Sequence, residues 1–537
     1  MKNQIFKILI AMMAIFTIQA CTDLEETLIG DVTTEISSDG ISSAGGGGGS
    51  GLLSGAFGEL RNAGTANHGG YYSIQEITTD EMFIGAKGGD WFDGGILIEL
   101  HQHSYGPTHA FVNGTWTQTY NAINTTNELL DGNPVLDENQ EAQVRTLRAY
   151  FYLRLLDLFG NVKIVTTPGV DSPQASRAEV FAFVESELLD ALGISEVSNS
   201  MDLSASGLGT DFNPFAINQF AALGILSKLY LNAEVYAGQN RYSEAAAAAS
   251  FVIDSGVYSL CGAGCSVANL GKRPDVASDP DELEGFAAVF APNNENNPEH
   301  IFSVFYDEES AGGMNFSQMN LHYSSQFTWN FDAQPWNGYA TLEEFYNSFD
   351  ANDARRDASF IVGEQLDFGG SAVLDFASDD ESLVLNYTPG INELGPNSQR
   401  EAGARPGKFS FKQFGRPDMD NDYPIIRLGD MYLVRAEGLA RASGDWNQAL
   451  PDVNTLRARA GASPFTSMDD NEFLAERGRE MFQEGDRRTS LIRFEAYNNA
   501  WWEKPVSPEH VNLFPIPFDQ IQAASGSSFT LSQNPGY

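Results

Sequence analysis

The three cysteines are the most reactive side chains of this 537-residue chain, and their spacing separates them into two groups. Cys261 and Cys265 are close enough in sequence to close a small loop as a disulfide. Two cysteines supply only half of a four-coordinate zinc site, and no matching pair of histidines or cysteines accompanies them. A disulfide is therefore expected if the chain is exported, because disulfides persist in oxidising compartments. Cys21 stands alone and needs its own interpretation.

Cys21 follows an export signal. A basic start precedes an apolar run over residues 8–18, and the small residue Ala20 comes directly before the cysteine. This is the layout of a secretory signal, and the run is too short to cross a bilayer as a helix. The stretch Ile18-Gln-Ala-Cys21 resembles the lipobox of bacterial lipoproteins, which implies removal of residues 1–20 and acylation of Cys21, for example with palmitate. A plain secreted protein is the alternative.

Residues 21–50 are expected to form an acylated, flexible tether. The acidic cluster at 22–26 resembles the sorting signal that places lipoproteins on the outer face of a bacterial outer membrane. Five glycines precede Ser50, and such a composition cannot bury enough apolar surface to fold. More than one acyl chain makes membrane anchoring stable. The tether would let the body, residues 51–537, stand off the membrane.

The sequence predicts neither a metal site nor an organic cofactor. Glycines at 46–51 match G-x-G-x-x-G by letter, but no strand precedes them and no acidic residue follows at the distance that a βαβ unit requires. His101 and His103 alternate as in a strand, without an identifiable third metal ligand. The acidic stretch 418–422 lacks the central glycine and terminal glutamate of a calcium-binding loop.

Composition excludes several classes of partner. The chain has 31 basic and 72 acidic residues and a net charge of −41, which opposes binding to nucleic acid and to anionic lipid surfaces. The same charge disfavours a strongly anionic polysaccharide. Hydrophobic residues make up 42% of the chain, and no second apolar segment is long enough to span a bilayer. The body is therefore expected to be globular.

Helix signals define the scaffold that must position any site. Apolar residues recur at helical spacing over residues 145–159, and Ser176 forms a capping box with Glu179 ahead of another apolar stripe. Further helices are expected from Asn213-Pro214 to Gly238 and over residues 242–254. The chain is thus predicted to be mainly α.

Two helical hairpins share a weak repeat. The matching positions are Ala233-Glu234, Gly238, Tyr242 and Ala245 in the first hairpin, and Ala436-Glu437, Gly444, Trp446 and Ala449 in the second. Small residues allow close approach and the aromatic fills the turn, as in tetratricopeptide-like pairs. Pro451 is expected to kink or shorten the second helix.

The helices are expected mainly in residues 115–260 and 425–500. Residues 70–110 and 265–425 contain short apolar runs broken by Gly, Pro, Asn and Asp, which predict loops and small strands. Binding residues are usually carried by such loops on a rigid scaffold.

The C-terminal region contains a series of motifs in order. They are Arg427-Leu-Gly-Asp430-Met-Tyr432-Leu-Val-Arg-Ala436-Glu437, Asn454-Thr-Leu-Arg457-Ala-Arg459-Ala-Gly461, Glu476-Arg477-Gly-Arg479-Glu480 with Glu484-Gly485-Asp486-Arg487-Arg488, Phe514-Pro515-Ile516-Pro517 and Gln533-Asn534-Pro535-Gly536-Tyr537. Together they resemble the SusD/RagB family. Upstream, Arg148-Ala-Tyr150 and Leu229-Tyr230-Leu231-Asn232 extend the resemblance to nearly all of residues 51–537. Pro451 and the glycine tract depart from the pattern outside these motifs.

The resemblance implies a SusD-like helical body with tetratricopeptide-like helix pairs and a loop-rich face that binds a nutrient, usually a glycan, outside the cell without catalysis. The implied partner is a SusC-like TonB-dependent outer-membrane transporter that receives the ligand. Two alternatives remain. A RagB-like relative would capture peptides, and a surface glycoside hydrolase would need two carboxylates set apart at a cleft, which the many acidic residues do not single out. The net charge favours a neutral glycan, for example a β-glucan such as laminarin.

Glycan capture needs flat apolar faces for sugar rings and polar groups for their hydroxyls. In the starch-binding prototype of the family, the ligand aromatics come from two neighbourhoods that match a glycine-rich loop near residue 90 and a stretch at 329–339. The predicted ligand-binding residues are Trp91, Trp336, Tyr339, Asn337, Trp329 and Asp90. The alternative is that these aromatics pack loops against helices, which is the interpretation favoured for Trp501 and Trp502. No catalytic residue is predicted.

The C-terminal arginines suggest a phosphate site at first sight. Acidic residues alternate with them at helical spacing: Arg477, Arg479, Arg487 and Arg488 among Glu476, Glu480, Glu484 and Asp486. Structural ion pairs are therefore favoured.

Overall fold

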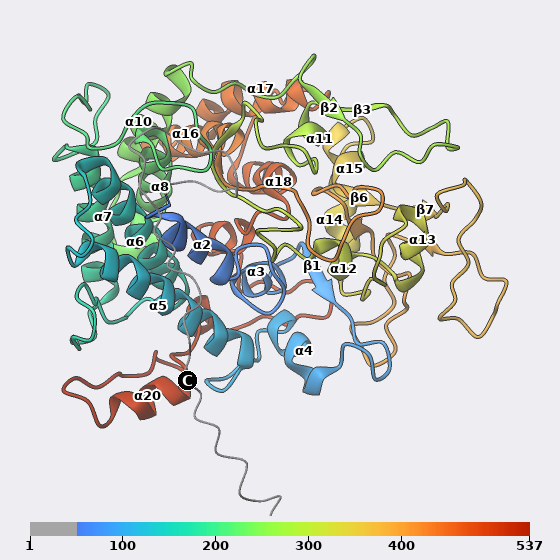
Figure 1. Ribbon diagram of the computed structural model, residues 1–537, viewed down its shortest axis with the longest axis horizontal. Coiled ribbons are helices and arrows are strands. Elements are labelled where there is room, and N and C mark those ends of the chain that lie inside the picture. Colours follow the sequence, from blue (N-terminus) through green and yellow to red (C-terminus); the bar gives the residue numbers. More distant parts are fainter. Residues whose placement is uncertain (1–50) are drawn as a thin grey trace, which may run out of the picture. The chain divides into compact units, whose positions relative to one another are not determined.

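Helices dominate residues 51–537, the part of the protein that the computed structural model describes (Figure 1). Strands are few and short, so the prediction of a mainly α chain is confirmed. The predicted signal peptide at 1–20, the acylated Cys21 and the tether at 21–50 lie outside the described residues. Between residues 51 and 537, no helix is both long and apolar enough to cross a membrane.

The longer helices lie in two groups along the chain. They are α5 (Ala110–Leu130), α6 (Glu138–Leu158), α7 (Arg177–Leu192), α8 (Gln219–Leu231) and α10 (Tyr242–Asp254), then α16 (Leu428–Ser443), α17 (Leu450–Arg459) and α18 (Asp470–Met481). Shorter helical segments are α2 (Ser54–Asn62), α3 (Tyr71–Glu76), η1 (Asp93–Gly95), α4 (Ile96–His101), α9 (Ala233–Ala237), α11 (Phe286–Val289), α12 (Phe316–Asn320), η2 (Tyr323–Ser325), α13 (Gln326–Trp329), α14 (Glu343–Asn347), α15 (Ala354–Ser359), η3 (Trp446–Ala449), α19 (Arg487–Arg493), η4 (Glu509–Asn512) and α20 (Phe518–Ala524).

The strands form separate antiparallel pairs. The pairs are β1 (Met82–Ile84) with β5 (Tyr339–Thr341), β4 (His300–Val304) with β10 (Tyr423–Arg427), β2 (Ser266–Ala268) with β3 (Glu282–Glu284), β6 (Phe360–Ile361) with β9 (Arg405–Pro406), and β7 (Gly363–Glu364) with β8 (Asn386–Tyr387). Cys261 and Cys265 are joined by a disulfide just before β2.

Local signals account for most helix starts. Ser176 and Glu179 form the predicted capping box of α7, and α10 has the expected bounds. The helix expected from Asn213-Pro214 begins later, because the side chain of Asn218 accepts a hydrogen bond from the Ala221 N–H and caps α8. Of the two effects predicted for Pro451, the kink is absent, and the α-helix is short: α17 begins only at Leu450, after η3, so the proline lies in its first turn, where its missing N–H costs nothing.

The prediction of a strand around His101 and His103 is wrong. His101 ends α4, and its Nε2 lies 2.8 Å from the carbonyl oxygen of Trp502. His103 is also buried, with Nε2 2.9 Å from the Thr78 carbonyl oxygen. Among residues 51–537, no group of three His, Cys, Asp or Glu side chains is arranged to hold a metal ion.

Helix α10 joins the two groups of helices by packing against both α8 and α16 (Figure 1). Gly438 on α16 makes this approach possible, because a Cβ there would lie 2.7 Å from the Tyr242 carbonyl oxygen. Gly238 and Gly444 end α9 and α16 with φ values of 67° and 72°, as the repeat of the two hairpins predicts.

Buried ion pairs hold the C-terminal motifs against the rest of the body. The pairs are Arg477 with Asp430 and Asp486, Arg479 with Glu472 and Glu476, Arg487 with Asp80 and Glu81, and Arg488 with Asp157. Of these pairs, Arg479 with Glu476 has the helical spacing that the sequence suggested. Most of the other ion pairs connect different elements. The arginines are therefore structural, and they hold distant segments of the chain together.

Candidate functional site

The β1–β5 pair brings two distant loops together. Ile84 pairs with Tyr339, so the end of β1 lies beside the start of β5. The chain leaving β1 carries Asp90 and Trp91, and the chain entering β5 carries Trp336. The antiparallel register therefore places both predicted aromatic stretches at one end of the same ladder.

Trp91 and Trp336 are joined directly. The indole N–H of Trp91 donates a hydrogen bond of 2.6 Å to the carbonyl oxygen of Trp336. The Trp336 backbone N–H in turn donates to the Gln318 carbonyl oxygen, also at 2.6 Å. Trp336 is 42% exposed, whereas Trp91 is partly buried with its ring edge-on to His68. Trp91 thus supports the turn from which the Trp336 side chain meets solvent.

Several residues in or near these loops have backbone conformations in the left-handed region. Positive φ values occur at Trp91 (59°), Asp93 (42°), Asn330 (47°) and Asn337 (59°). A bulky side chain in the left-handed region is a true outlier, and each such residue costs of order 1–3 kcal/mol. Surrounding contacts must enforce these conformations, and strain of this kind clusters at binding sites.

Polar groups flank the aromatic pair. The Tyr323 hydroxyl donates to Oδ2 of the exposed Asp90. Partial burial raises the pKa of the Asp90 carboxyl above its ordinary value, and the positive charges of Lys87 and Arg400 oppose that rise. Phe92, beside Trp91, is 47% exposed. The arrangement combines apolar faces with a carboxylate and a phenol, which suits a polyhydroxylated ligand.

Sequence reasoning missed Tyr323 and His68. Tyr323 lies in η2 and belongs to no motif, although it is an aromatic residue close to the predicted stretch. Burial lowers the pKa of His68 to about 4, so its imidazole is neutral at physiological pH. The ring of His68 contacts Trp91, Phe111 and Tyr339 edge-on. Both residues come to the site only through the tertiary fold.

Two other predicted residues lie beneath the surface. Tyr339 is fully buried in β5, with its hydroxyl 2.6 Å from the Ser73 Oγ. Asn337 is also fully buried, and its backbone N–H donates to the Leu321 carbonyl oxygen at 2.9 Å. Neither side chain is presented to solvent, so we assign both a supporting role under the Trp336 turn.

Trp329 lies in a different environment. Its ring stacks on Phe331 with centroids 5.9 Å apart and meets Phe411 edge-on. It lines an open pocket to which Trp91, Trp336 and Asp90 do not contribute. Trp501 and Trp502 pack against His103 and Phe83, as the packing interpretation expects. The structure therefore unites Trp91, Trp336 and Asp90 and separates Trp329 from them.

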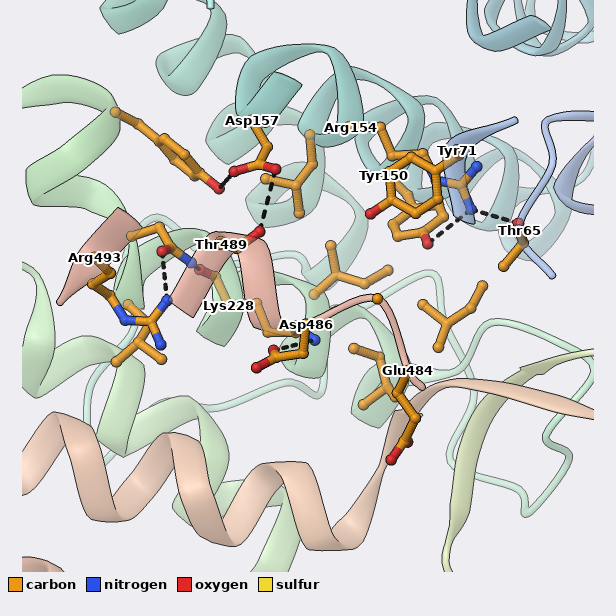
Figure 2. A pocket seen from close by; sticks show the side chains of 18 of the residues that line it. Thr65, Tyr71, Tyr150, Arg154, Asp157, Lys228, Glu484, Asp486, Thr489 and Arg493 are labelled. Carbon is orange, nitrogen blue, oxygen red and sulfur yellow. Dashed lines mark hydrogen bonds and ion pairs between the residues drawn. The ribbon is translucent and has the colours of Figure 1, made fainter. Parts of the chain in front are cut away.

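A small internal cavity of about 80 Å³ lies between α6, α8 and the segment leading into α19 (Figure 2). Much of its polar lining is paired, since Arg493 donates to Asn232 at 2.7 Å and Thr489 donates to Asp157 at 3.2 Å, whereas Nε of Arg154 and Nη1 of Arg477 have no hydrogen-bond partner among residues 51–537. Ligand pockets usually measure about 300–1,000 Å³, whereas a water molecule needs far less space. This cavity is large enough for water. The hydrogen bonds of Arg493 and Thr489 beside it join the C-terminal segment to the helical scaffold.

Comparison with known proteins identifies the fold. The chain resembles a SusD superfamily protein from Parabacteroides distasonis with a TM-score of 0.67, 19% identity, and coverage of 90% of this chain and 98% of that one. It resembles surface glycan-binding protein A from Bacteroides thetaiotaomicron, solved in complex with laminarihexaose, with a TM-score of 0.66, 19% identity and the same coverage. A laminarin-binding SusD-like protein gives a TM-score of 0.64 at 21% identity, again over 90% and 98% of the two chains. The helical body with its loop-rich face is the SusD-like fold.

Sequence comparison points to the same family. The model of the SusD family matches residues 281–537. The starch-binding protein SusD of Bacteroides thetaiotaomicron is 23% identical over 521 residues, covering 87% of this chain and 85% of that protein. The resemblance to the SusD/RagB family inferred from the C-terminal motifs is thereby confirmed.

Proposed function

We propose that this protein is a cell-surface glycan-binding lipoprotein that captures a neutral oligo- or polysaccharide on the face formed by Trp91 and Trp336. The hydrogen bond from the Trp91 indole to the Trp336 carbonyl carries the proposal, because it unites two aromatic loops 245 positions apart at an exposed surface. Asp90 and Tyr323 supply hydrogen-bonding groups beside the aromatic faces. Binding occurs without catalysis.

The relatives support a glycan as the ligand class. One is a starch-binding protein, and another was solved with laminarihexaose bound. A net charge of −41 favours a neutral glycan, such as a β-glucan, over an anionic one. Peptide capture remains the alternative, and glycoside hydrolysis is a further one.

Anchoring and delivery complete the proposal. An acylated Cys21 holds the body at the outer face of the outer membrane, and residues 22–50 allow it to move over a SusC-like TonB-dependent transporter that receives the glycan. The lipobox-like stretch and the family resemblance support these two steps.

Titration calorimetry against laminarihexaose, maltohexaose and an anionic oligosaccharide tests the binding function. We expect binding of a neutral probe and at least a tenfold loss in Trp336→Ala, which corresponds to about 1.4 kcal/mol. Phe518→Ala, an equally exposed aromatic on α20, is the matched control and should bind as wild type does. Equal affinity in Trp336→Ala would remove the site. Release of reducing sugar from the probe would instead support hydrolysis.

A further inference from the structure

A large open pocket lies apart from the Trp91–Trp336 face. It measures about 1110 Å³ and is bounded by the β2–β3 hairpin, α11, α13, α15 and β6. In Figure 1, β2, β3 and α11 lie near the top, whereas α4, which follows the Trp91 loop, lies near the lower edge. The volume is slightly above the range of about 300–1,000 Å³ seen for ligand sites. The pocket is large enough for several sugar rings.

Three aromatic side chains line this pocket: Phe286, Trp329 and Phe411. Trp329, which is partly exposed, is backed by Phe331 in a nearly parallel stack of 13° between the ring planes. Phe411 and Phe286 add buried apolar surface. Gly262 and Ala263 also line the pocket, within the loop that the Cys261–Cys265 disulfide closes. A backed tryptophan in a rigid pocket is a platform on which a sugar ring can stack.

Two hydroxyl groups in the lining lack partners. The Oγ1 atom of Thr328 and the Oγ atom of Ser410 are buried, and neither has a hydrogen-bond partner among residues 51–537. Thr328 is only 2% exposed and immediately precedes Trp329. A buried hydroxyl without a partner costs about 1–3 kcal/mol. Neither oxygen is accessible from the pocket in this conformation, so a ligand that can both donate and accept would reach them only after rotation about χ1 of Thr328 or Ser410.

The charges of the pocket favour a neutral ligand. Its cationic side chains are already neutralised: Arg273 by Asp279 at 2.7 Å, Arg459 by Glu299 at 2.9 Å, and Lys408 by Glu484. Glu284 and Glu364 also line the pocket, and neither forms an ion pair within the described part of the chain. The uncompensated charge is therefore negative, which repels phosphate, sulfate and uronic acid groups.

We propose that this pocket is a second carbohydrate-binding site, in which a short segment of neutral glycan stacks on Trp329 and, after rotation about χ1, hydrogen-bonds to the hydroxyls of Thr328 and Ser410. This inference rests on the proposed glycan-binding function and adds a second contact region to it. A long glycan that reaches both regions would be held more tightly than by either one, because the second contact becomes intramolecular.

Calorimetry with laminarihexaose and maltohexaose tests the second site through its stoichiometry. For the oligosaccharide that binds, we expect two molecules per wild-type protein, one in Trp329→Ala, one in Trp336→Ala and none in the double variant. Thr328→Val preserves the side-chain shape and should weaken the second site at least fivefold while leaving the first site unchanged. Each variant is checked by its melting temperature, and Phe518→Ala again serves as the control.

The outcomes separate this inference from the proposed function. One molecule bound per wild-type protein, lost in Trp336→Ala and unaffected by Trp329→Ala and Thr328→Val, overturns the second site and leaves the function standing. Binding that depends on Trp329 alone supports the pocket and overturns the Trp91–Trp336 site. If neither oligosaccharide binds, or if a neutral peptide binds in the pocket instead, the second carbohydrate site is refuted.

Discussion

The indole N–H of Trp91 reaches the carbonyl oxygen of Trp336 at 2.6 Å and so ties the loop after β1 to the loop before β5. The bond uses the edge of Trp91 and the backbone of Trp336, which leaves the Trp336 ring, 42% exposed, free to contact a ligand. The two tryptophans therefore have different roles. Trp91 holds the turn that carries Trp336, and the Trp336 ring is exposed to solvent.

Trp91→Phe separates these roles. Phenylalanine keeps an aromatic ring but has no N–H, so the Trp336 carbonyl loses its donor. A hydrogen bond contributes about 1 kcal/mol net, and we expect glycan affinity to fall about fivefold. Calorimetry with the bound oligosaccharide measures the change. Trp446→Phe, in η3 of the helical scaffold, is the matched control and should leave affinity unaltered. Equal losses in both variants would contradict a local role for the Trp91 N–H.

Gly338→Ala tests the packing beneath the Trp336 turn. A Cβ at this position would lie 2.8 Å from the Met319 carbonyl oxygen and 3.1 Å from Cζ2 of Trp91, so backbone or indole must move. We expect a loss of stability of about 1–3 kcal/mol together with weaker glycan binding. Gly89→Ala, in the Trp91 loop, meets nothing within 4 Å and should be tolerated. Chemical denaturation and calorimetry of both variants decide the matter, and wild-type behaviour of Gly338→Ala would refute the packing argument.

Local patterns explain why the scaffold was predictable from the sequence and the site only in part. The capping box of Ser176 and Glu179 and the apolar spacing of 242–254 act over a few residues, so they can be read directly. The pairing of β1 with β5 joins three-residue strands that carry no periodic signal, and the contacts of Tyr323 with Asp90 and of His68 with Trp91 depend on the tertiary fold. Composition likewise identified tryptophans suited to sugars, but it could not separate the exposed Trp336 from Trp329 in another pocket.

Glu480→Gln probes the buried charges of the C-terminal motifs. The Glu480 carboxylate accepts hydrogen bonds from Arg427 at 2.8 Å, from Arg355 at 3.0 Å and from Arg459. Burial alone would raise its pKa, but these arginines hold the pKa well below the ordinary value. Removing the charge leaves buried cations uncompensated, and we expect a loss of about 3–5 kcal/mol in urea denaturation. Glu472→Gln removes the partly exposed partner of Arg479 and should cost less than about 1 kcal/mol. Similar losses in the two variants would contradict the network.

Cys21→Ser tests the division between anchor and binding body. Serine cannot carry the lipid, so we expect the protein to be lost from the outer-membrane fraction while the purified chain keeps its glycan affinity. Cell fractionation and calorimetry measure the two properties. The double variant Cys261→Ser, Cys265→Ser removes the other cysteines and should retain the membrane association. Retention of Cys21→Ser at the surface would disprove lipid anchoring.

Glu76 makes stability depend on pH near neutrality. Burial raises the pKa of its carboxyl to about 8, although the Gly485 N–H donates to Oε1 at 2.7 Å and opposes the rise. Between the unfolded value of 4.5 and pH 8, the folded chain therefore holds a proton that the unfolded chain releases, so stability falls as pH rises. The buried histidines act in the opposite direction below their ordinary pKa of about 6.5, because their folded pKa values are lowered. The window from pH 6.5 to 8 lies above the titration of the histidines. Burial also raises the pKa of the Glu81 carboxyl and lowers the pKa of Lys408 to about 8, so the difference in slope between a Glu76 variant and wild type is what isolates this carboxyl.

We expect Glu76→Gln, which mimics the protonated carboxyl, to reduce the decline of stability across this window. The largest effect of one group is about 1.4 kcal/mol per pH unit. Urea denaturation at half-unit steps from pH 6.5 to 8 measures the slope. Glu128→Gln changes an exposed carboxyl on α5 and should decline as wild type does. A wild-type slope in Glu76→Gln would mean that this carboxyl is already ionised in the folded protein. A smaller slope would show that a buried, protonated Glu76 at the end of α3 makes the stability of the body depend on pH.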